Sequence, residues 1–318
     1  MSPAFYTAGM PAHRFLQWIP AVTVTLIMVT GVAVHTAADE APHRLPLESE
    51  FVGRDAHVAV LLPQAYAREP EARFRVLYVL PVEPGVERRY GDPLAVIKSL
   101  GLHDKHRLIC VVPEFDTMPW YGDHATDKQV RHDSHMVRAV IPFVDGRFRT
   151  LAEPDGRLLV GFSKSGLGAV SLLLRHRDLF GFAASWDAPL MLIDRQFGAW
   201  KTDEHFGTPD NMAAQMPSAL IRRHAAALRG RPRLVITGKN LFGTSSDRKF
   251  AYDGPSHTEA FHSLADDLGV PHAYNADIAA PHAWHEKWVA PVVDMLMQIS
   301  SGPGSERVPT SSSGKQAE

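Results

Sequence analysis

Short apolar runs alternate with amphipathic stretches along most of the chain. The apolar runs predict strands at His57–Leu62, Phe74–Leu80, Leu108–Val112, Arg157–Val160, Phe180–Ser185, Arg233–Thr237 and His272–Asn275. Apolar residues at helical spacing predict helices at Pro93–Leu100, Asp127–Phe143, Leu167–Leu174, Ala219–Leu228, Ser256–Leu268 and Trp288–Ile299. Residues Met191–Pro217 have little regular pattern, so we expect an irregular excursion above the sheet. Alternating strands and helices favour an α/β fold, with a mostly parallel sheet covered by helices on both faces.

The two ends of the chain differ from this middle part. The first 38 residues contain an apolar stretch, Phe15–Val34, followed by small residues up to Ala38, which is the layout of a secretory signal peptide. The alternative is an uncleaved membrane anchor, since about 20 apolar residues can cross a bilayer. Residues 301–318 are rich in Ser and Gly and predict a disordered tail. We therefore expect one domain, residues 39–300, that is secreted or periplasmic and has no stable membrane association after signal cleavage.

Composition and charge narrow the classes of function. The formal net charge of -2 provides no basic surface, so no nucleic-acid partner is expected. The single cysteine, Cys110, excludes an intramolecular disulfide and lies in an apolar run that predicts burial. A hydrophobic content of 45% is enough for a large core.

The stretch Leu158–Ser171 has the strongest chemical signal. An apolar strand ends just before Ser163, and a helical pattern with small residues begins directly after it. A serine on such a sharp strand-to-helix turn projects its hydroxyl above the carboxyl edge of the sheet, which predicts a nucleophile. The Gly-x-Ser-x-Gly pattern is incomplete, because Ser165 takes the fifth position and glycine follows one place later. A packing turn without chemistry is the alternative. A phosphate-binding loop fits less well, because Lys164 lies three places past Gly161.

A serine nucleophile requires a general base, and the segment Pro281–Trp288 supplies the best candidate. It follows the last predicted strand and precedes the last helix, which places His282 at the carboxyl edge of the sheet. His285 lies one turn further on, where it could line the pocket or cap the helix. These two histidines and Glu286 have a spacing that could hold a metal ion, but it is not the His-Glu-x-x-His arrangement. We expect no metal and no cofactor.

A family resemblance rests on four segments: His57–Tyr66, Arg75–Leu80, Gly161–Gly168 and His282–Trp288. They resemble the Putative esterase family of α/β-hydrolases, which includes esterase D, feruloyl and acetyl xylan esterases, enterochelin esterases and mycolyltransferases. The likeness extends over about Val52–Leu296. It implies an α/β-hydrolase fold with Ser163 as nucleophile and His282 as base.

The chain departs from this family at the loop that helps to bind the oxyanion. Family members usually have a His-Gly pair after the second strand, whereas this chain has Pro81 and Val82. Proline has no N–H group to donate. We therefore expect the oxyanion donors to be the backbone N–H of Val82 or Glu83, together with that of Lys164.

The acid of the triad is the second departure. The usual slot lies just after the strand Arg233–Thr237, and the nearest residue there is Asn240, an amide that cannot stabilise imidazolium as a carboxylate would. Asp187 follows the strand Phe180–Ser185 directly, whereas Asp247 lies in a long loop. We favour Asp187, because a strand end positions a side chain better than a long loop does. Asp247 is the alternative.

Aromatic and polar residues near these strand ends predict a substrate pocket, although the loop before His124 could instead pack on its own aromatic rings. Flat apolar rings stack on aryl groups or sugars while polar groups bind hydroxyls. The candidate pocket residues are Trp120, Tyr121, His124, Trp186 and Trp284.

Together these features predict an exported serine hydrolase. It would cleave carboxylic esters, of small molecules or linked to carbohydrate, through an acyl-enzyme on Ser163. An acyltransferase of the same fold and a non-catalytic binding protein with a degenerate hydrolase site are the alternatives.

Overall fold

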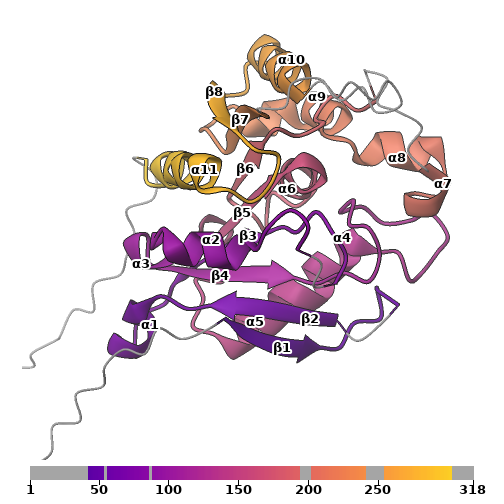
Figure 1. The fold of residues 1–318 in the computed structure, drawn as a ribbon. Helices are drawn as coiled ribbons and strands as arrows, with labels where there is room; N and C mark the ends of the chain where they lie inside the picture. Colours follow the sequence, from indigo (N-terminus) through magenta and orange to yellow (C-terminus); the bar gives the residue numbers. More distant parts are fainter. Residues whose placement is uncertain (1–41, 54–55, 86–87, 194–201, 241–253, 303–318) are drawn as a thin grey trace, which may run out of the picture. The chain divides into compact units, whose positions relative to one another are not determined.

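One mixed sheet forms the centre of the described chain. A computed structural model describes residues 42–53, 56–85, 88–193, 202–240 and 254–302 (Figure 1). The strands are β1 (His43–Leu47), β2 (Ala56–Leu61), β3 (Arg75–Val79), β4 (Leu108–Pro113), β5 (Arg157–Phe162), β6 (Phe182–Trp186), β7 (Leu234–Asn240) and β8 (Ala273–Ala280). Their order is β1-β2-β4-β3-β5-β6-β7-β8, and β2 runs antiparallel to both of its neighbours while all pairs from β4 to β8 are parallel. The predicted α/β fold is confirmed.

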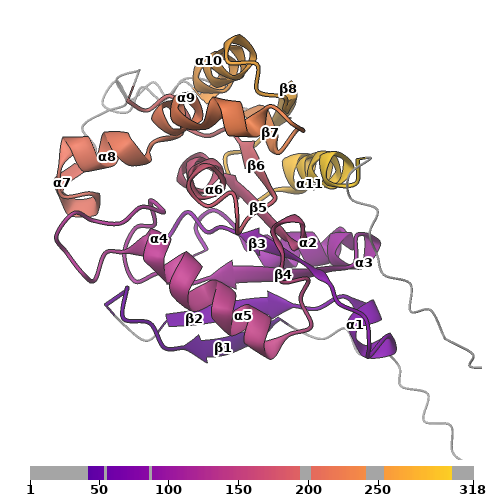
Figure 2. The same ribbon diagram turned by 180° about the vertical axis from the view of Figure 1, so that it is seen from behind.

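Helices cover both faces of the sheet (Figures 1 and 2). Apolar residues of α2 (Pro93–Ser99), α3 (Leu102–Lys105) and α11 (Glu286–Ser300) pack in one core cluster. Those of α5 (Ile141–Arg147), α6 (Ser163–Arg175), α9 (Pro217–Leu228) and α10 (Gly254–Asp267) pack in the other. Strand β5 serves both cores because side chains alternate along a strand: Leu158 and Val160 point to the first cluster and Leu159 to the second.

Shorter elements complete the described chain. They are α1 (Gln64–Arg68), α4 (His132–His135), the π-helix Met136–Val140, the 3₁₀ turn Pro154–Gly156, α7 (Thr202–His205) and α8 (Pro209–Gln215). No helix within the described ranges is long and apolar enough to cross a membrane. The N-terminal segment and almost all of the C-terminal tail lie outside these ranges, so both stay predictions.

Several elements differ from the sequence-based expectation, and the short helices α1 and α3 were not predicted. Strand β1 was not predicted, because it is an edge strand whose mostly exposed residues leave no apolar run. The helix expected over Asp127–Phe143 is divided into α4, the π-helix and α5, and Pro142 has no N–H for the carbonyl four residues earlier. Part of the stretch expected to be irregular, Met191–Pro217, forms α7 and α8.

The sheet order brings the loops after β3, β5, β6 and β8 to one edge of the sheet. Strand β5 lies between β3 and β6, with Val79 beside Val160 and Phe162 beside Trp186. The carboxyl ends of parallel strands meet at the same edge, where ligand sites of open α/β sheets lie. The residues that follow β3, β5, β6 and β8 therefore face one region.

Candidate active site

The turn between β5 and α6 holds Ser163 in a strained conformation. Its φ angle is 52°, in the left-handed region that a side chain with a Cβ seldom adopts. The buried Ser165 closes the turn: its Oγ accepts from the Phe162 N–H at 3.1 Å and donates to the Phe162 carbonyl at 2.9 Å. The serine in the fifth position of the motif therefore holds the elbow through two hydrogen bonds to one residue.

Asp187 occupies a second strained turn at the end of β6. It is fully buried, and its φ angle is 45°. The Ser163 N–H donates to the Asp187 carbonyl at 3.2 Å, and the Asp187 N–H donates to the Thr237 carbonyl at 3.0 Å. Backbone hydrogen bonds thus hold the two left-handed turns against each other and against β7.

The structure brings His282 to Asp187. The His282 Nδ1 lies 2.6 Å from Asp187 Oδ2, which is a short, charge-assisted hydrogen bond. The imidazole lies among aromatic rings, with ring centroids 5.2 Å from Phe162, 6.1 Å from Tyr90 and 6.3 Å from Trp186. Since Phe162 directly precedes Ser163, the imidazole lies beside the elbow with its Nδ1 side occupied by the carboxylate.

The loop around His282 is fixed by its own hydrogen bonds. The Trp288 Nε1–H donates to the Ala283 carbonyl at 2.6 Å, and the Trp284 N–H donates to the Tyr90 carbonyl at 2.7 Å. His285 caps α11, because its Nδ1 accepts from the Lys287 N–H at 3.2 Å. Of the two roles considered for His285, the structure gives it the cap.

Trp186 occupies the space next to the end of β7. Its ring stacks on Trp288 at 5.2 Å and 5°, and its Nε1–H donates to the Ile278 carbonyl at 2.8 Å. Gly238 has a φ of +97°, and a Cβ on it would lie 2.1 Å from Trp186 Cδ1, so only glycine fits there. Trp186 is fully buried and offers no surface to a substrate, which corrects the prediction that it walls a pocket.

Asp247 lies outside the described residues. Asn240 is the last residue of β7.

The loop expected to bind the oxyanion is held by Tyr121. The Tyr121 hydroxyl donates to the Pro81 carbonyl. In a planar trans peptide the N–H points away from the carbonyl, so the Val82 N–H is directed away from Tyr121. The Tyr121 ring fits here because Gly168, in α6, has no side chain. A Cβ on Gly168 would lie only 2.1 Å from the Tyr121 ring.

Two of the predicted pocket residues in the loop before His124 are buried. Tyr121 is fully buried, and Trp120 is 2% exposed. His124 Nδ1 accepts the N–H groups of Thr126 and Asp127 at 3.1 and 2.8 Å, which forms a local turn. The buried Trp120 packs against His205 and Phe206, and the buried Tyr121 packs against Phe115, so neither ring presents a binding surface. His124 is half-buried, and its place in a substrate pocket stays a prediction.

Lys164 combines a backbone donor with a partly buried ammonium. Its N–H is among the first four of α6, which have no acceptor inside the helix and lie at the positive end of the helix dipole. The Nζ lies 5.8 Å from the Trp120 ring centroid. Burial lowers the pKa of Lys164 to about 8; Glu83 opposes this shift, and Arg89 adds to it.

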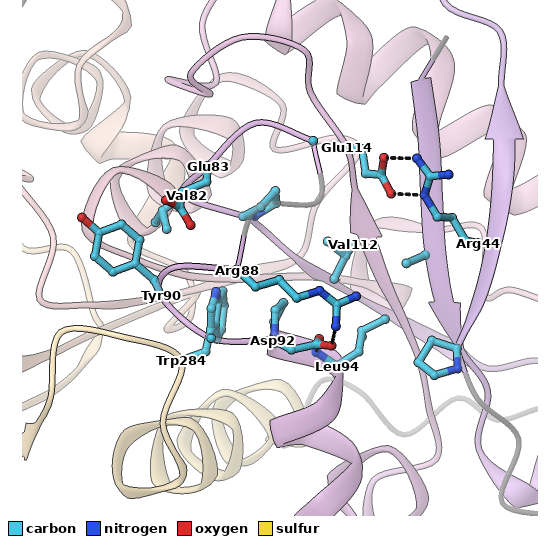
Figure 3. Close-up of a pocket in the computed structure, with 16 residues that line it drawn as sticks. Arg44, Val82, Glu83, Arg88, Tyr90, Asp92, Leu94, Val112, Glu114 and Trp284 are labelled. Carbon is cyan, nitrogen blue, oxygen red and sulfur yellow. Dashed lines mark hydrogen bonds and ion pairs between the residues drawn. The ribbon is translucent and has the colours of Figure 1, made fainter.

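A cavity of about 220 Å³ lies beside the loop that follows β3 (Figure 3). Its lining includes Val82, Glu83, Tyr90 and Trp284. The Tyr90 ring also contacts the rings of Phe162 and His282, and the Trp284 ring contacts that of Phe162, which precedes Ser163. The lining also carries two ion pairs: Arg44 binds Glu114 through two hydrogen bonds of 2.7 and 2.8 Å, and Arg88 pairs with Asp92. Of the sequence-predicted pocket residues, only Trp284 lines this cavity.

Residues 49–298, more than half of the chain, match the sequence model of a family described as Putative esterase. The chain belongs to this family. The predicted resemblance is thereby confirmed, and it covers the elbow, Asp187 and the His282 segment.

Relatives of this Putative esterase member include two mycobacterial proteins. Esterase MT1326 and Esterase Rv1288, from the CDC 1551 and H37Rv strains of Mycobacterium tuberculosis, are each 28% identical to it over 156 residues. The match covers 48% of this chain and only 33% of either relative. The chain thus matches about a third of their length.

Solved structures of several hydrolases have a similar fold. The fluorophosphonate-binding serine hydrolase FphF of Staphylococcus aureus has a TM-score of 0.61 at 16% identity, and MPT51 (FbpC1) of M. tuberculosis has 0.60 at 18%. A ferulic acid esterase gives 0.60 at 16%. Each comparison covers 82% of this chain and 98% of the other. At such identities the likeness establishes the α/β-hydrolase fold.

Sequence reasoning missed several residues of this esterase-family site. Tyr90 contacts both Phe162 and His282, and Arg89 pairs at 3.0 Å with the side chain of Glu83, for which only a backbone role was predicted. All of these lie after β3, where the sequence has Pro, Gly and charged residues and no periodic pattern. The Pro- and Gly-containing loop after a strand was the available signal, since such loops carry binding residues.

Proposed function

We propose that this protein is an exported serine hydrolase that cleaves carboxylic esters through an acyl-enzyme on Ser163. The observation that carries this function is the 2.6 Å contact between His282 Nδ1 and the fully buried Asp187 carboxylate, at a turn bonded to the Ser163 backbone. A carboxylate on Nδ1 fixes the imidazole so that Nε2 can act as general base. Membership of an esterase family supports the same reaction class.

In the proposed reaction, Ser163 Oγ attacks the ester carbonyl carbon as His282 Nε2 takes its proton. The negative charge of Asp187 stabilises the imidazolium, and the backbone N–H groups of Lys164 and of Val82 or Glu83 bind the oxyanion. The tetrahedral intermediate expels the alcohol, which takes the proton from His282. Water then attacks the acyl-enzyme with His282 again as base, and releases the acid and free Ser163.

The cavity favours esters with an aryl or sugar component. Tyr90 and Trp284 offer rings for stacking, while the charged groups of Glu83, Asp92 and Arg88 can bind hydroxyl groups. Acyl transfer to an alcohol acceptor would use the same acyl-enzyme, with the acceptor in place of water. The N-terminal segment, residues 1–38, supports export, because its apolar stretch followed by small residues suits a signal peptide.

Covalent labelling tests the nucleophile directly. A fluorophosphonate probe should label the intact protein once, and labelling should disappear in Ser163→Ala. Ser171→Ala is the matched control: it removes a buried serine hydroxyl from the same helix and should leave labelling unchanged. Folded wild-type protein that fails to react with the probe, or a Ser163→Ala protein that still reacts, would contradict the assignment and favour a non-catalytic binding protein.

A further inference from the structure

A second cluster of histidine and carboxylate groups lies at the opposite end of β8 from His282. His262 and Asp266 are four residues apart on α10, which places them on one face of the helix. His272 precedes the first residue of β8. One ligand atom from each of the three side chains lies within 4.8 Å of the other two.

The two imidazoles of this cluster are already oriented toward each other. His262 Nδ1 lies 2.8 Å from His272 Nε2. His272 Nδ1 lies 2.8 Å from the Val270 carbonyl, which can only accept, so Nδ1 carries the proton and Nε2 has the lone pair. His262 stacks on the Tyr274 ring with a centroid distance of 3.7 Å and an angle of 9°, which fixes its plane. Both rings are therefore held before any ligand arrives.

The carboxylate completes the set from the solvent side. Asp266 Oδ2 lies 3.6 Å from His262 Nε2, and Asp266 Oδ1 lies 4.0 Å from His272 Nε2. The Asp266 side chain is 61% exposed, whereas that of His272 is 3% exposed. An ion can thus reach the cluster from solvent while its deepest ligand stays rigid.

We propose that His262, Asp266 and His272 bind a divalent transition-metal ion of the Zn²⁺ type. Two imidazoles and one carboxylate are a donor set for zinc and its neighbours, whereas Ca²⁺ and Mg²⁺ prefer oxygen ligands alone. Three protein ligands leave one tetrahedral position for water. The Val270 carbonyl on the far nitrogen of His272 supplies the outer hydrogen bond that metal-bound histidines usually have.

Zinc binding requires a small movement of the two imidazole rings and a proton shift within His262. Two nitrogens bound to one tetrahedral Zn²⁺ lie about 3.3 Å apart for Zn–N bonds of about 2.0 Å, so the two rings must separate by about half an ångström. His262 carries the proton in the present 2.8 Å contact, because His272 Nε2 has none. It must therefore move that proton from Nδ1 to Nε2, with no net proton release. The bound ion would join the last turn of α10 to the start of β8.

Zinc binding to the full chain, stripped with EDTA, tests this site. Equilibrium dialysis against Zn²⁺ with metal analysis should show one equivalent more on wild type than on His272→Asn. The asparagine amide can still donate to the Val270 carbonyl but removes the Nε2 ligand. Asp266→Asn is a mild surface change and should weaken zinc binding at this site about tenfold or more. Zn²⁺ should also raise the melting temperature of wild type more than that of either variant.

The matched control is His224→Asn, on the neighbouring helix α9 and outside the cluster, which should bind zinc as wild type does. The site is refuted if wild type binds no Zn²⁺, or if wild type, His272→Asn and Asp266→Asn bind the same number of ions with the same affinity. Because Asp266→Asn changes an exposed side chain, this comparison holds even if His272→Asn fails to fold. None of these measurements depends on ester hydrolysis.

Discussion

His272 and His282 lie just outside the two ends of the same strand, β8, and differ mainly in what binds their Nδ1 atoms. For His282 the partner is the carboxylate of Asp187 at 2.6 Å; for His272 it is the carbonyl of Val270 at 2.8 Å. In both cases the bond at Nδ1 fixes the imidazole, and the proposed chemistry falls to Nε2.

The charge of the partner separates the two roles. A buried carboxylate stabilises a protonated imidazole, which suits a base that accepts a proton and returns it. A neutral carbonyl fixes the tautomer without favouring protonation, which suits a metal ligand. Asp266, near His272, is largely exposed, and water screens its charge. In the two proposed roles, the same side chain would serve two kinds of chemistry according to the burial and charge of one neighbour.

Replacing aspartate by asparagine should affect only kcat at one site and only zinc affinity at the other. Asp187→Asn should lower kcat for a simple aryl ester by about 10³–10⁴-fold, because the amide neither stabilises imidazolium nor holds the right tautomer. Its zinc affinity should not change. Asp266→Asn should weaken zinc binding and leave kcat unchanged. Steady-state kinetics and zinc titration on both variants give the four values.

Asp187→Ala should lose activity to a similar degree. Retention of nearly full turnover by Asp187→Ala would transfer the role of acid to another carboxylate, with Asp247 the first candidate. Such a result would also show that the charge of Asp187 does not explain the difference between the proposed roles of His282 and His272.

A buried histidine without a carboxylate partner extends the comparison to stability. His135 is fully buried with Nδ1 2.8 Å from Ser49 Oγ, and burial lowers its pKa to about 4 from an ordinary value of 6.5. Between these pH values the unfolded chain binds a proton that the folded protein does not. The free energy of unfolding should therefore fall by up to about 3 kcal/mol as pH decreases from about 6.5 to 4.

His135→Asn should reduce this pH dependence, because asparagine keeps a polar group near Ser49 but does not titrate. Urea unfolding at pH 7 and pH 5 measures the difference. His43→Asn, which changes an exposed histidine, is the control and should retain the wild-type pH dependence. An unchanged slope in His135→Asn would assign the acid sensitivity to other groups, with His132, whose pKa burial lowers to about 3, the next to test.

The smallest expected effect concerns the loop after β3. Tyr121→Phe removes the hydroxyl that donates to the Pro81 carbonyl and should lower kcat about tenfold, or about 1.4 kcal/mol, if this bond directs the Val82 N–H at the oxyanion. KM and the zinc affinity at His272 should stay as in wild type. A kcat equal to that of wild type would show that the loop is oriented by other contacts.

Much of the fold was predictable because buried parallel strands leave near-continuous apolar runs. All seven predicted strands exist, with ends that differ by a few residues. Strand β1 was missed because a mostly exposed edge strand has no such run. Helices α7 and α8 were missed because short helices with few buried residues have no clear period. The hydrophobic pattern of a sequence reflects which side chains are buried, so it does not reveal elements that bury few side chains.

For the site, sequence order predicted which residues follow strand ends, and the structure brings Asp187 and His282 together as that order implies. Their catalytic roles stay predictions until the variants are measured. The failure was with side-chain direction: Tyr121 and Trp186 are near the site in sequence and space, yet both point into the core. Nothing in a sequence distinguishes an aromatic ring that binds substrate from one that holds a loop. The cluster of His262, Asp266 and His272 was missed because His272 reaches the other two only through the turn between α10 and β8, which the sequence pattern does not predict.

The tryptophans around His282 give this protein an optical property. Trp186, Trp284 and Trp288 are three of the six tryptophans in the chain; Trp288 lies 5.2 Å from Trp186 and 5.0 Å from Trp284, and Trp186 lies 6.3 Å from the His282 ring. The fluorescence of an indole depends on the groups that surround its ring. Emission from this cluster should therefore change when a ligand alters the surroundings of these rings, so that binding beside His282 can be followed by light without any added label.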